Sequence, residues 1–251
     1  MTARLDLHGR AALVTGAAKR VGKSIALALA SQGMRLGVHY NSSRTDAAAA
    51  LADFRAAGGD GVLLPADLRD RGAARSLVDS AVDALGGLDL LVCSAASFER
   101  VPLDEVDDAA WDRTLGLNLG SQFALAQRAL PALRTSHGSI VFITCSSATT
   151  PFRNHVPYVV AKGALKQLMR TLALEVAPEV RVNAVAPGTV LPPEELDPAV
   201  VQRLAQSVPL RRTGSAEDIA DAVVFLARSP FITGHEIAVD GGRGVAKVER
   251  F

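Results

Sequence analysis

The amino-acid sequence predicts an α/β fold, a single doubly wound domain whose seven-stranded parallel sheet carries helices on both faces. Two observations predict it. Short apolar runs alternate with longer amphipathic segments along the chain, which is typical of a parallel sheet joined by right-handed helical crossovers. The apolar runs show little alternation of polar and apolar residues, as expected for strands that are buried on both faces.

Each predicted element follows from its local pattern. Strands are expected where apolar residues stand together, at 11–15, 36–40, 62–65, 88–93, 139–144, 180–186 and 236–239. Helices are expected where apolar residues recur at helical spacing, at 20–32, 44–57, 70–85, 107–133, 157–177 and 216–228. No linker or repeat divides the chain, so we expect one domain over residues 1–251. The Pro-rich connection 187–209 is expected to hold a short helix within 194–207, and connections of this length often cover a site.

The composition excludes several classes of protein. Apolar residues make up 49% and charged residues 21% of the 251 positions, which is ordinary for a globular domain. The 27 Lys and Arg residues balance 26 Asp and Glu residues, so no charge excess favours nucleic acid or a membrane as partner. Two cysteines and scattered histidines predict neither a disulfide framework nor a metal site. A charged start without an apolar run predicts a cytoplasmic protein with no signal peptide.

A glycine-containing turn follows the first predicted strand and precedes the first helix. It contains Gly16, Arg20, Val21 and Gly22. Backbone N–H groups and the helix dipole at such a turn attract phosphate. The turn therefore predicts a Rossmann-type dinucleotide site.

The end of the second predicted strand indicates which dinucleotide binds. An NAD site usually has an Asp or Glu about 20 residues after the glycine turn, but residues 39–44 read His-Tyr-Asn-Ser-Ser-Arg. The planar guanidinium groups of Arg20 and Arg44 suit a 2′-phosphate. We therefore expect NADPH rather than NADH, unless both arginines are only solvated surface charges.

Tyr158 and Lys162 are four residues apart in a predicted helix, so they share one face. A nearby ammonium favours the phenolate and lowers the pKa of a tyrosine from about 10. Such a tyrosine can donate a proton to a carbonyl oxygen while a hydride reaches the carbon. The pair follows the fifth predicted strand, near the ligand crevice of a doubly wound sheet. We therefore expect both residues to be catalytic rather than ordinary surface residues.

Further motifs fall in order along the chain: Asp67, Asn118, Pro187-Gly188 and Asp240-Gly241-Gly242. With the glycine turn and the Tyr–Lys pair, they give a chain that resembles the short-chain dehydrogenase/reductases over nearly its whole length. The resemblance implies that Lys162 binds the nicotinamide ribose and that Asn118 holds a water linking Lys162 to solvent. It also implies a homotetramer formed through the helices at 107–133 and 157–177.

Within that family the chain is most similar to bacterial and protozoan pteridine reductases, in the stretches TGAAKRVG, HYNSS, ASFER and APGTVLPPEE. This implies that Phe98 stacks a pterin ring against the nicotinamide, although an ordinary loop-anchoring role stays open, and that Arg20 also contacts the substrate. The resemblance further implies that the NADPH phosphates meet Arg20, Ser42 and Ser43, the adenine meets Asp67 and Leu68, and the ribose and nicotinamide side meets Ser94 and Ala95. The other cofactor-binding residues that it implies are Gly16, Val21, Gly22, Tyr40, Asn41, Tyr158, Lys162, Pro187, Gly188, Thr189 and Val190.

The sequence departs from the family pattern in two places. After the fourth strand the family has Asn-Asn-Ala-Gly, or Asn-Asn-Ala-Ser in pteridine reductases, where this chain has Cys-Ser-Ala-Ala at 93–96. Thirteen residues before Tyr158 the family has a Ser, or an Asp in pteridine reductases, and this chain has Cys145. A thiol is a weaker hydrogen-bond donor than a hydroxyl. Three alternatives stay open: Cys145 itself donates to or positions the substrate, Ser146 takes over this role, or the reductase activity is weak or absent.

These observations predict an NADPH-dependent reductase that transfers a hydride to a pterin C=N bond, with Tyr158 as proton donor. Two alternatives stay open. One is the same chemistry on another carbonyl compound, such as an acyl thioester, a sugar or a steroid ketone. The other is a cofactor-binding homologue with little or no turnover, because of the departures at Cys93 and Cys145.

Overall fold

The computed structural model describes residues 4–192 and 196–246. Its seven strands form one sheet in the order β3-β2-β1-β4-β5-β6-β7, and every neighbouring pair is parallel. The strands are β1 (Ala11–Val14), β2 (Arg35–Tyr40), β3 (Asp60–Pro65), β4 (Leu90–Cys93), β5 (Ser139–Ile143), β6 (Arg181–Pro187) and β7 (Glu236–Val239). The predicted α/β class with a seven-stranded parallel sheet is confirmed.

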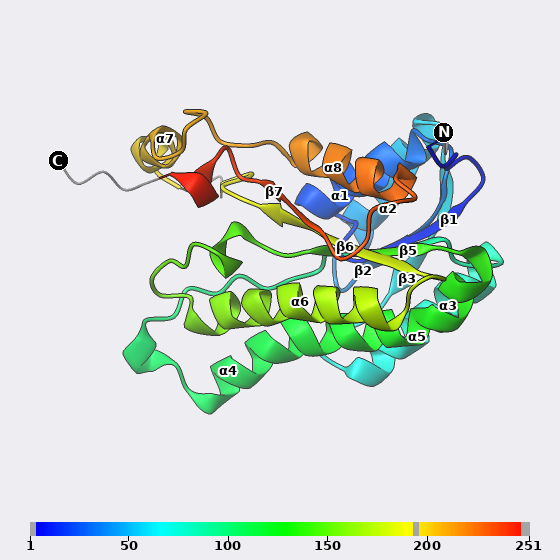
Figure 1. The fold of residues 1–251 in the computed structure, drawn as a ribbon, viewed down its shortest axis with the longest axis horizontal. Helices are drawn as coiled ribbons and strands as arrows, with labels where there is room; N and C mark the ends of the chain where they lie inside the picture. The colour runs from blue at the N-terminus through cyan, green and yellow to red at the C-terminus, as the bar shows by residue number, and fades with distance from the viewer. Residues whose placement is uncertain (1–3, 193–195, 247–251) are drawn as a thin grey trace.

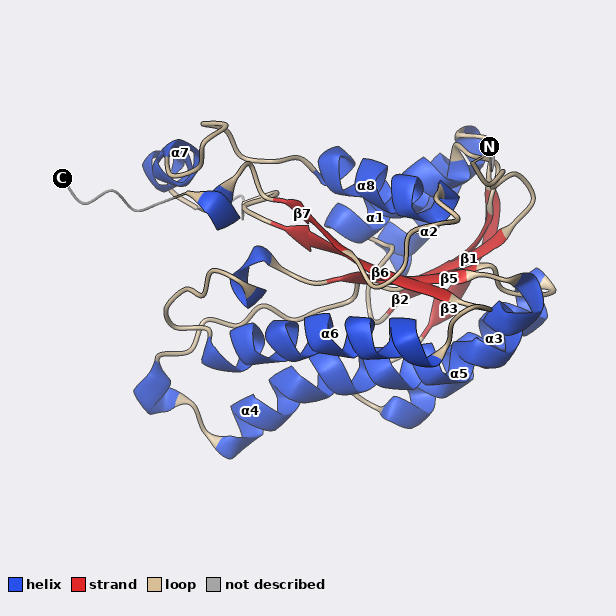
Figure 2. Ribbon diagram, in the orientation of Figure 1, coloured by secondary structure: helices blue, strands red, loops and turns tan. Residues whose placement is uncertain are grey.

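Helices cover both faces of the sheet (Figures 1 and 2). One face carries α1 (Arg20–Ala30), α2 (Arg44–Ala56) and α8 (Ala216–Arg228). The other carries α3 (Arg71–Leu85), α4 (Asp108–Leu115), α5 (Ser121–Ser136) and α6 (Val156–Glu175). A hydrophobic core lies on each side of the sheet, and the central strands β1, β4 and β5 are buried on both faces.

The chain order reverses between β1 and β4, which are neighbours in the sheet. From β1 the chain runs outward through β2 and β3, and from β4 it runs the other way to β7. Loops at the carboxyl ends of β1 and β4 therefore diverge and leave a crevice between them. This topology places the candidate site.

The predicted helix at 107–133 differs from the structure. It is divided into α4, a π-helical turn at Gly116–Gly120 and α5. Two glycines bound this turn, and glycine is a poor helix former. Single π-helical turns inside helices often occur at functional sites. This turn carries Asn118.

The long connection after β6 contains α7 (Pro198–Gln206), consistent with the short helix expected there. The carboxylate of Asp197 accepts the Ala199 N–H at 2.7 Å and caps the first turn. Residues 194 and 195 of the expected helix lie outside the described residues. None of the described helices combines the length and the apolar character needed to cross a bilayer.

Candidate active site

The glycine turn is held against β4 by the hydroxyl of Thr15. Its Oγ1 accepts the N–H groups of Ser94 at 2.9 Å and Ala95 at 3.0 Å. Gly16 has a φ of +68°, and a Cβ there would lie 3.2 Å from the Cα of Ala95. The backbone of the turn thus approaches β4 closely, which a larger residue would prevent.

The first helix begins without a side-chain cap. The backbone at Lys19 is extended, and no side-chain oxygen accepts the first N–H groups of α1. A Cβ on Gly22 would lie 2.2 Å from the carbonyl oxygen of Gly16, so only glycine allows this helix start. The uncapped N–H groups remain available to an anion. The turn has the form of a phosphate-binding site, as the sequence predicts.

A cleft of about 680 Å³ opens at the turn and runs along the carboxyl ends of the strands. Nine of the predicted cofactor-binding residues line it: Gly16, Arg20, Val21, Gly22, Asn41, Asp67, Leu68, Ser94 and Ala95. The volume, the close backbone approach and the uncapped helix fit a dinucleotide. The individual contacts of these residues with a cofactor stay predictions.

Sequence reasoning missed several residues of this cleft, among them Lys19, Arg69, Glu99 and Arg113. Lys19 could have been found, because it is a basic residue inside the glycine turn. Its Nζ lies 2.7 Å from a carboxylate oxygen of Asp46. Glu99 and Arg113 pair across the cleft at 3.7 Å, and no local motif marks residues that meet only in the fold.

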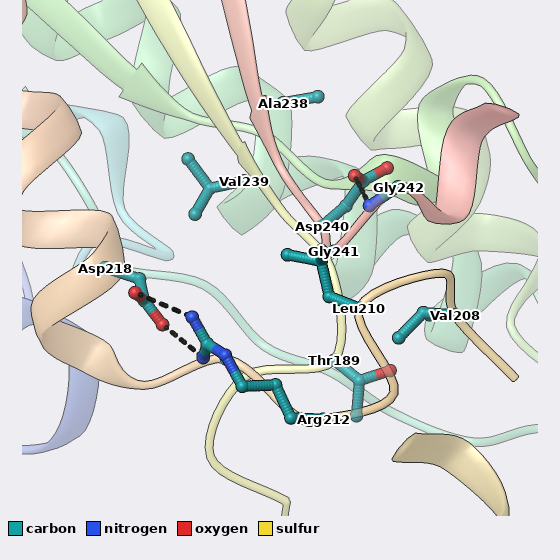
Figure 3. A pocket seen from close by; sticks show the side chains of 11 residues that line it. Thr189, Val208, Leu210, Arg212, Asp218, Ala238, Val239, Asp240, Gly241 and Gly242 are labelled. Atoms are coloured by element: carbon teal, nitrogen blue, oxygen red, sulfur yellow. Dashed lines mark hydrogen bonds and ion pairs between the residues drawn. The ribbon is translucent and has the colours of Figure 1, made fainter. Parts of the chain in front are cut away.

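Other predicted cofactor residues lie elsewhere in the structure. Tyr40 is buried against Ala18 and Ala47. Thr189 borders a second hollow of about 330 Å³ at the carboxyl end of β7 (Figure 3), where its hydroxyl lies 3.3 Å from the guanidinium of Arg243. The polar groups drawn in Figure 3 are paired within the protein, Arg212 with Asp218 at 3.1 Å and the carboxylate of Asp240 with the Gly242 N–H at 2.9 Å.

Three further predicted residues, Pro187, Gly188 and Val190, flank Thr189 after β6. The Gly188 N–H donates to the carbonyl of Val239 at 2.9 Å, and Val190 forms an isolated bridge with Gly214. Ser42 and Ser43 precede α2, at the carboxyl end of β2. The structure therefore brings the phosphate-turn residues into one cleft, while contacts of these other residues with a cofactor stay predictions.

Tyr158 and Lys162 lie one turn apart in α6 and are both buried. The ammonium of Lys162 donates to the carbonyl of Ile143 at 2.8 Å and lies 5.6 Å from the centroid of the Tyr158 ring. Burial in this apolar surrounding lowers the pKa of Lys162 to about 8. The expected Tyr–Lys pair is therefore present as a close buried pair.

The expected lowering of the Tyr158 pKa is wrong for this structure. Burial raises the pKa of Tyr158, and the neighbouring Cys145 raises it further. The ammonium lies over the ring and donates to a backbone carbonyl, so desolvation of the phenolate outweighs the favourable charge. Tyr158 therefore keeps its proton at neutral pH.

Cys145 occupies the end of β5 beside Tyr158. Its Sγ accepts the Ser147 N–H at 3.4 Å and caps a short 3-10 turn, Ser146–Ala148. Cys145 is half-buried, whereas Ser146 is buried and belongs to the turn that follows. Of these two residues, Cys145 is the one that raises the pKa of Tyr158.

Asn118 has an unsatisfied acceptor. Its Nδ2 donates to Ser97 Oγ at 3.1 Å and to the Thr114 carbonyl at 3.0 Å. Its Oδ1 is buried and has no protein partner. A buried acceptor without a partner is a natural place for an ordered water. This arrangement agrees with the water-holding role that the family resemblance implies.

An aromatic group surrounds Tyr158. The Phe98 ring meets the Tyr158 ring edge-on at a centroid distance of 4.9 Å and stacks on His155 at 4.4 Å. Phe152 contacts both Phe98 at 6.0 Å and His155 at 5.0 Å. Phe98 is 59% exposed, which leaves part of an apolar ring open beside Tyr158. Sequence reasoning found Phe98 but missed Phe152.

A dinucleotide cleft at the reversal point of a parallel sheet, beside a buried Tyr–Lys pair, defines an oxidoreductase that moves a hydride and a proton. Among residues 4–192 and 196–246, no three His, Cys, Asp or Glu side chains are grouped so that they could hold a metal ion.

The chain belongs to the short-chain dehydrogenase/reductase family. The family model described as enoyl-(acyl carrier protein) reductase matches residues 16–243. The chain is 36% identical over 242 residues to the granaticin polyketide synthase putative ketoacyl reductase 2 of Streptomyces violaceoruber, and the match covers 92% of this chain and 94% of that protein.

Two solved structures extend the comparison. A putative short-chain alcohol dehydrogenase from Sinorhizobium meliloti 1021 has a TM-score of 0.91 at 36% identity, over 96% of this chain and 99% of that one. FolM alternative dihydrofolate reductase 1 from Brucella canis, solved with NADP, has a TM-score of 0.90 at 34% identity, over 96% of both chains. The chain is therefore an NAD(P)-dependent reductase of this family.

Proposed function

We propose that this protein is an NADPH-dependent reductase that transfers a hydride to a C=N bond of a pterin ring, with Tyr158 as the proton donor. The observation that carries the pterin assignment is the open face of Phe98, 59% exposed and 4.9 Å from the Tyr158 ring. A flat heteroaromatic ring gains stacking energy on such a face. The similarity to an enzyme called an alternative dihydrofolate reductase supports the same class.

The basic groups at the cleft support NADPH over NADH. Lys19 and Arg20 stand in the glycine turn, and the Arg20 guanidinium donates to the carbonyl of Leu191. The first acidic residue after β2 is Asp46, and its carboxylate forms an ion pair with Lys19 at 2.7 Å. A 2′-phosphate is favoured by this charge, and a ribose 2′-hydroxyl finds no carboxylate partner at the end of β2.

The reduction adds one hydride to carbon and one proton to nitrogen. NADPH, when bound, supplies the hydride. The raised pKa of Tyr158 keeps its hydroxyl protonated at neutral pH, so the group is ready to donate. The substrate nitrogen becomes strongly basic as negative charge develops on it, and it takes the proton from the Tyr158 hydroxyl.

Two residues support Tyr158 during this transfer. The ammonium of Lys162, 5.6 Å from the ring centroid, stabilises the phenolate that forms. Asn118 Oδ1 would hold a water, through which a proton returns toward Lys162 and Tyr158. Cys145, whose side chain raises the pKa of Tyr158, would orient the substrate nitrogen toward the donor.

A second candidate is reduction of a β-ketoacyl thioester. The similarity to a putative ketoacyl reductase supports it, at 36% identity. The same Tyr158, Lys162 and Asn118 would serve this reaction, because a carbonyl oxygen also needs one proton. The two candidates differ in the need for an aromatic stacking face, which a linear acyl chain does not use.

Turnover assays distinguish these candidates. NADPH oxidation is followed by absorbance with dihydrobiopterin, dihydrofolate, a β-ketoacyl thioester and a panel of ketones, with Tyr158→Phe as the control. Pterin turnover that is lost in the control supports the proposal. Turnover of thioester or ketones alone would replace the pterin assignment. Binding of NADPH without turnover of any substrate would indicate a non-catalytic homologue.

We also propose that the chain forms a homotetramer through α4, α5 and α6. Apolar side chains stand exposed on two of these helices, Phe123 at 40% on α5, and Val160 at 44% and Leu174 at 80% on α6. Exposed apolar groups on neighbouring helices favour association. Light scattering of the protein should give the mass of four chains, and Val160→Glu should lower it, whereas a monomeric mass would exclude this assembly.

A further inference from the structure

His39, near the end of β2, has both ring nitrogens hydrogen-bonded to backbone. The Gly16 N–H lies 2.9 Å from Nδ1, and the Ala66 carbonyl lies 3.1 Å from Nε2. The backbone carbonyl of His39 also accepts the Ala17 N–H at 2.9 Å. The residue is 2% exposed. Two successive N–H groups of the glycine turn are therefore attached to one residue of β2.

These partners allow only one form of the imidazole ring. An amide N–H can only donate, so Nδ1 must carry a lone pair toward Gly16. A carbonyl oxygen can only accept, so Nε2 must carry the hydrogen toward Ala66. The ring is thus the neutral Nε2–H tautomer. Burial also lowers the pKa of His39, which favours the neutral form.

The two attachment points belong to two different segments at the dinucleotide cleft, which follow the strands on either side of β2. Gly16 belongs to the phosphate turn after β1, and Ala66 follows β3 and directly precedes Asp67 and Leu68, which also line the cleft. The His39 ring spans the distance between them. No other described side chain hydrogen-bonds both the glycine turn and the Ala66 carbonyl.

We propose that His39 is a positioning residue for the nucleotide cofactor. In its neutral Nε2–H form, oriented by the bond to Ala66, its Nδ1 holds the Gly16 N–H of the phosphate turn in place and thereby sets the affinity for the nucleotide. The residue acts through Gly16 and Ala66 and takes no part in hydride or proton transfer. The inference rests on the nucleotide site of the proposed function but does not depend on the pterin assignment.

Three substitutions separate positioning from simple space filling. His39→Phe keeps a ring but removes both hydrogen bonds. His39→Asn can present its amide oxygen near the Nδ1 position and accept the Gly16 N–H, whereas His39→Gln reaches toward the Nε2 position and Ala66 only. Leaving a buried N–H without a partner costs enough free energy to weaken binding by about tenfold.

The measurement is the Kd of NADPH and of NADH without substrate, with kcat determined at saturating cofactor. We expect His39→Phe and His39→Gln to raise Kd by about tenfold with a much smaller change in kcat, and His39→Asn to recover most of the affinity. The exposed His235→Asn is the matched control and should bind as the unchanged protein does. Equal affinity of the Phe and Asn variants would overturn the proposal, and so would losses that fall on kcat alone.

A second readout is made on the unchanged protein, and the variants serve only to assign its signal. Nitrogen NMR of the protein labelled at histidine should show one neutral Nε2–H ring that is absent from His39→Asn and present in His235→Asn. A Nδ1–H tautomer or a charged ring at neutral pH for this residue would contradict the two hydrogen bonds and the proposal with them. Failure of pterin turnover would leave the Kd values and the histidine NMR signal unchanged.

Discussion

Raising the pH above 8 should weaken catalysis through Lys162. Burial lowers the pKa of this ammonium to about 8 in the ligand-free protein. A group with that pKa is about 90% charged at pH 7 and about 10% charged at pH 9. Because the charge stabilises the phenolate left on Tyr158, we expect kcat/KM for NADPH to fall by about tenfold over these two pH units. kcat/KM is the right quantity, because it reports groups of the free enzyme.

The matched variant is Lys162→Arg, since a guanidinium stays charged across this range. Its activity can be lower throughout, but its profile should be flat where that of the unchanged protein falls. An unchanged break near pH 8 in the variant would refute the assignment to Lys162. A flat profile in the unchanged protein up to about pH 9 would refute the lowered pKa.

Unfolding cannot account for the expected fall. Lys162 has a pKa of about 8 in the fold and the ordinary value of 10.5 when unfolded, so the unfolded chain holds more protons between these values. Its contribution to stability therefore rises with pH above 8. The buried thiol of Cys93, whose pKa is raised from 9.0, opposes this only above pH 9. Thermal melting between pH 8 and 9 should show no loss of stability from these two groups.

Four substitutions test the site. Phe98→Ala should raise the KM for a pterin by about tenfold through lost stacking, while the Kd of NADPH stays unchanged; an unchanged KM would exclude stacking. Cys145→Ser should raise kcat, by up to about 100-fold, because a hydroxyl is a better hydrogen-bond donor than a thiol. Ser146→Ala should leave kcat unchanged. The reverse pattern would make Ser146 the residue that orients the substrate. Gly22→Ala should abolish cofactor binding, because its Cβ would lie 2.2 Å from a carbonyl oxygen of the turn; titration with NADPH shows whether binding survives.

Local patterns predicted most of the fold. The buried strands read as continuous apolar runs because both their faces are covered, and the structure has a strand that overlaps each run. The predicted and observed strand boundaries differ by one or two residues. Asp89, for example, lies just before β4, and its carboxylate accepts the Ala11 N–H at 2.8 Å. The division of the helix at 107–133 was missed because a single π-helical turn disturbs the helical spacing over only a few residues.

The sequence by itself determined the glycine turn, the Tyr158–Lys162 pair and the class of reaction, because these depend on residue types at short spacing. Only the tertiary structure decided the state of those groups. It buries Tyr158 so deeply that desolvation outweighs the charge of Lys162, and it joins Gly16 to His39 across 23 residues. Burial and contacts between distant segments arise only when the chain is packed, so spacing along the sequence cannot specify them.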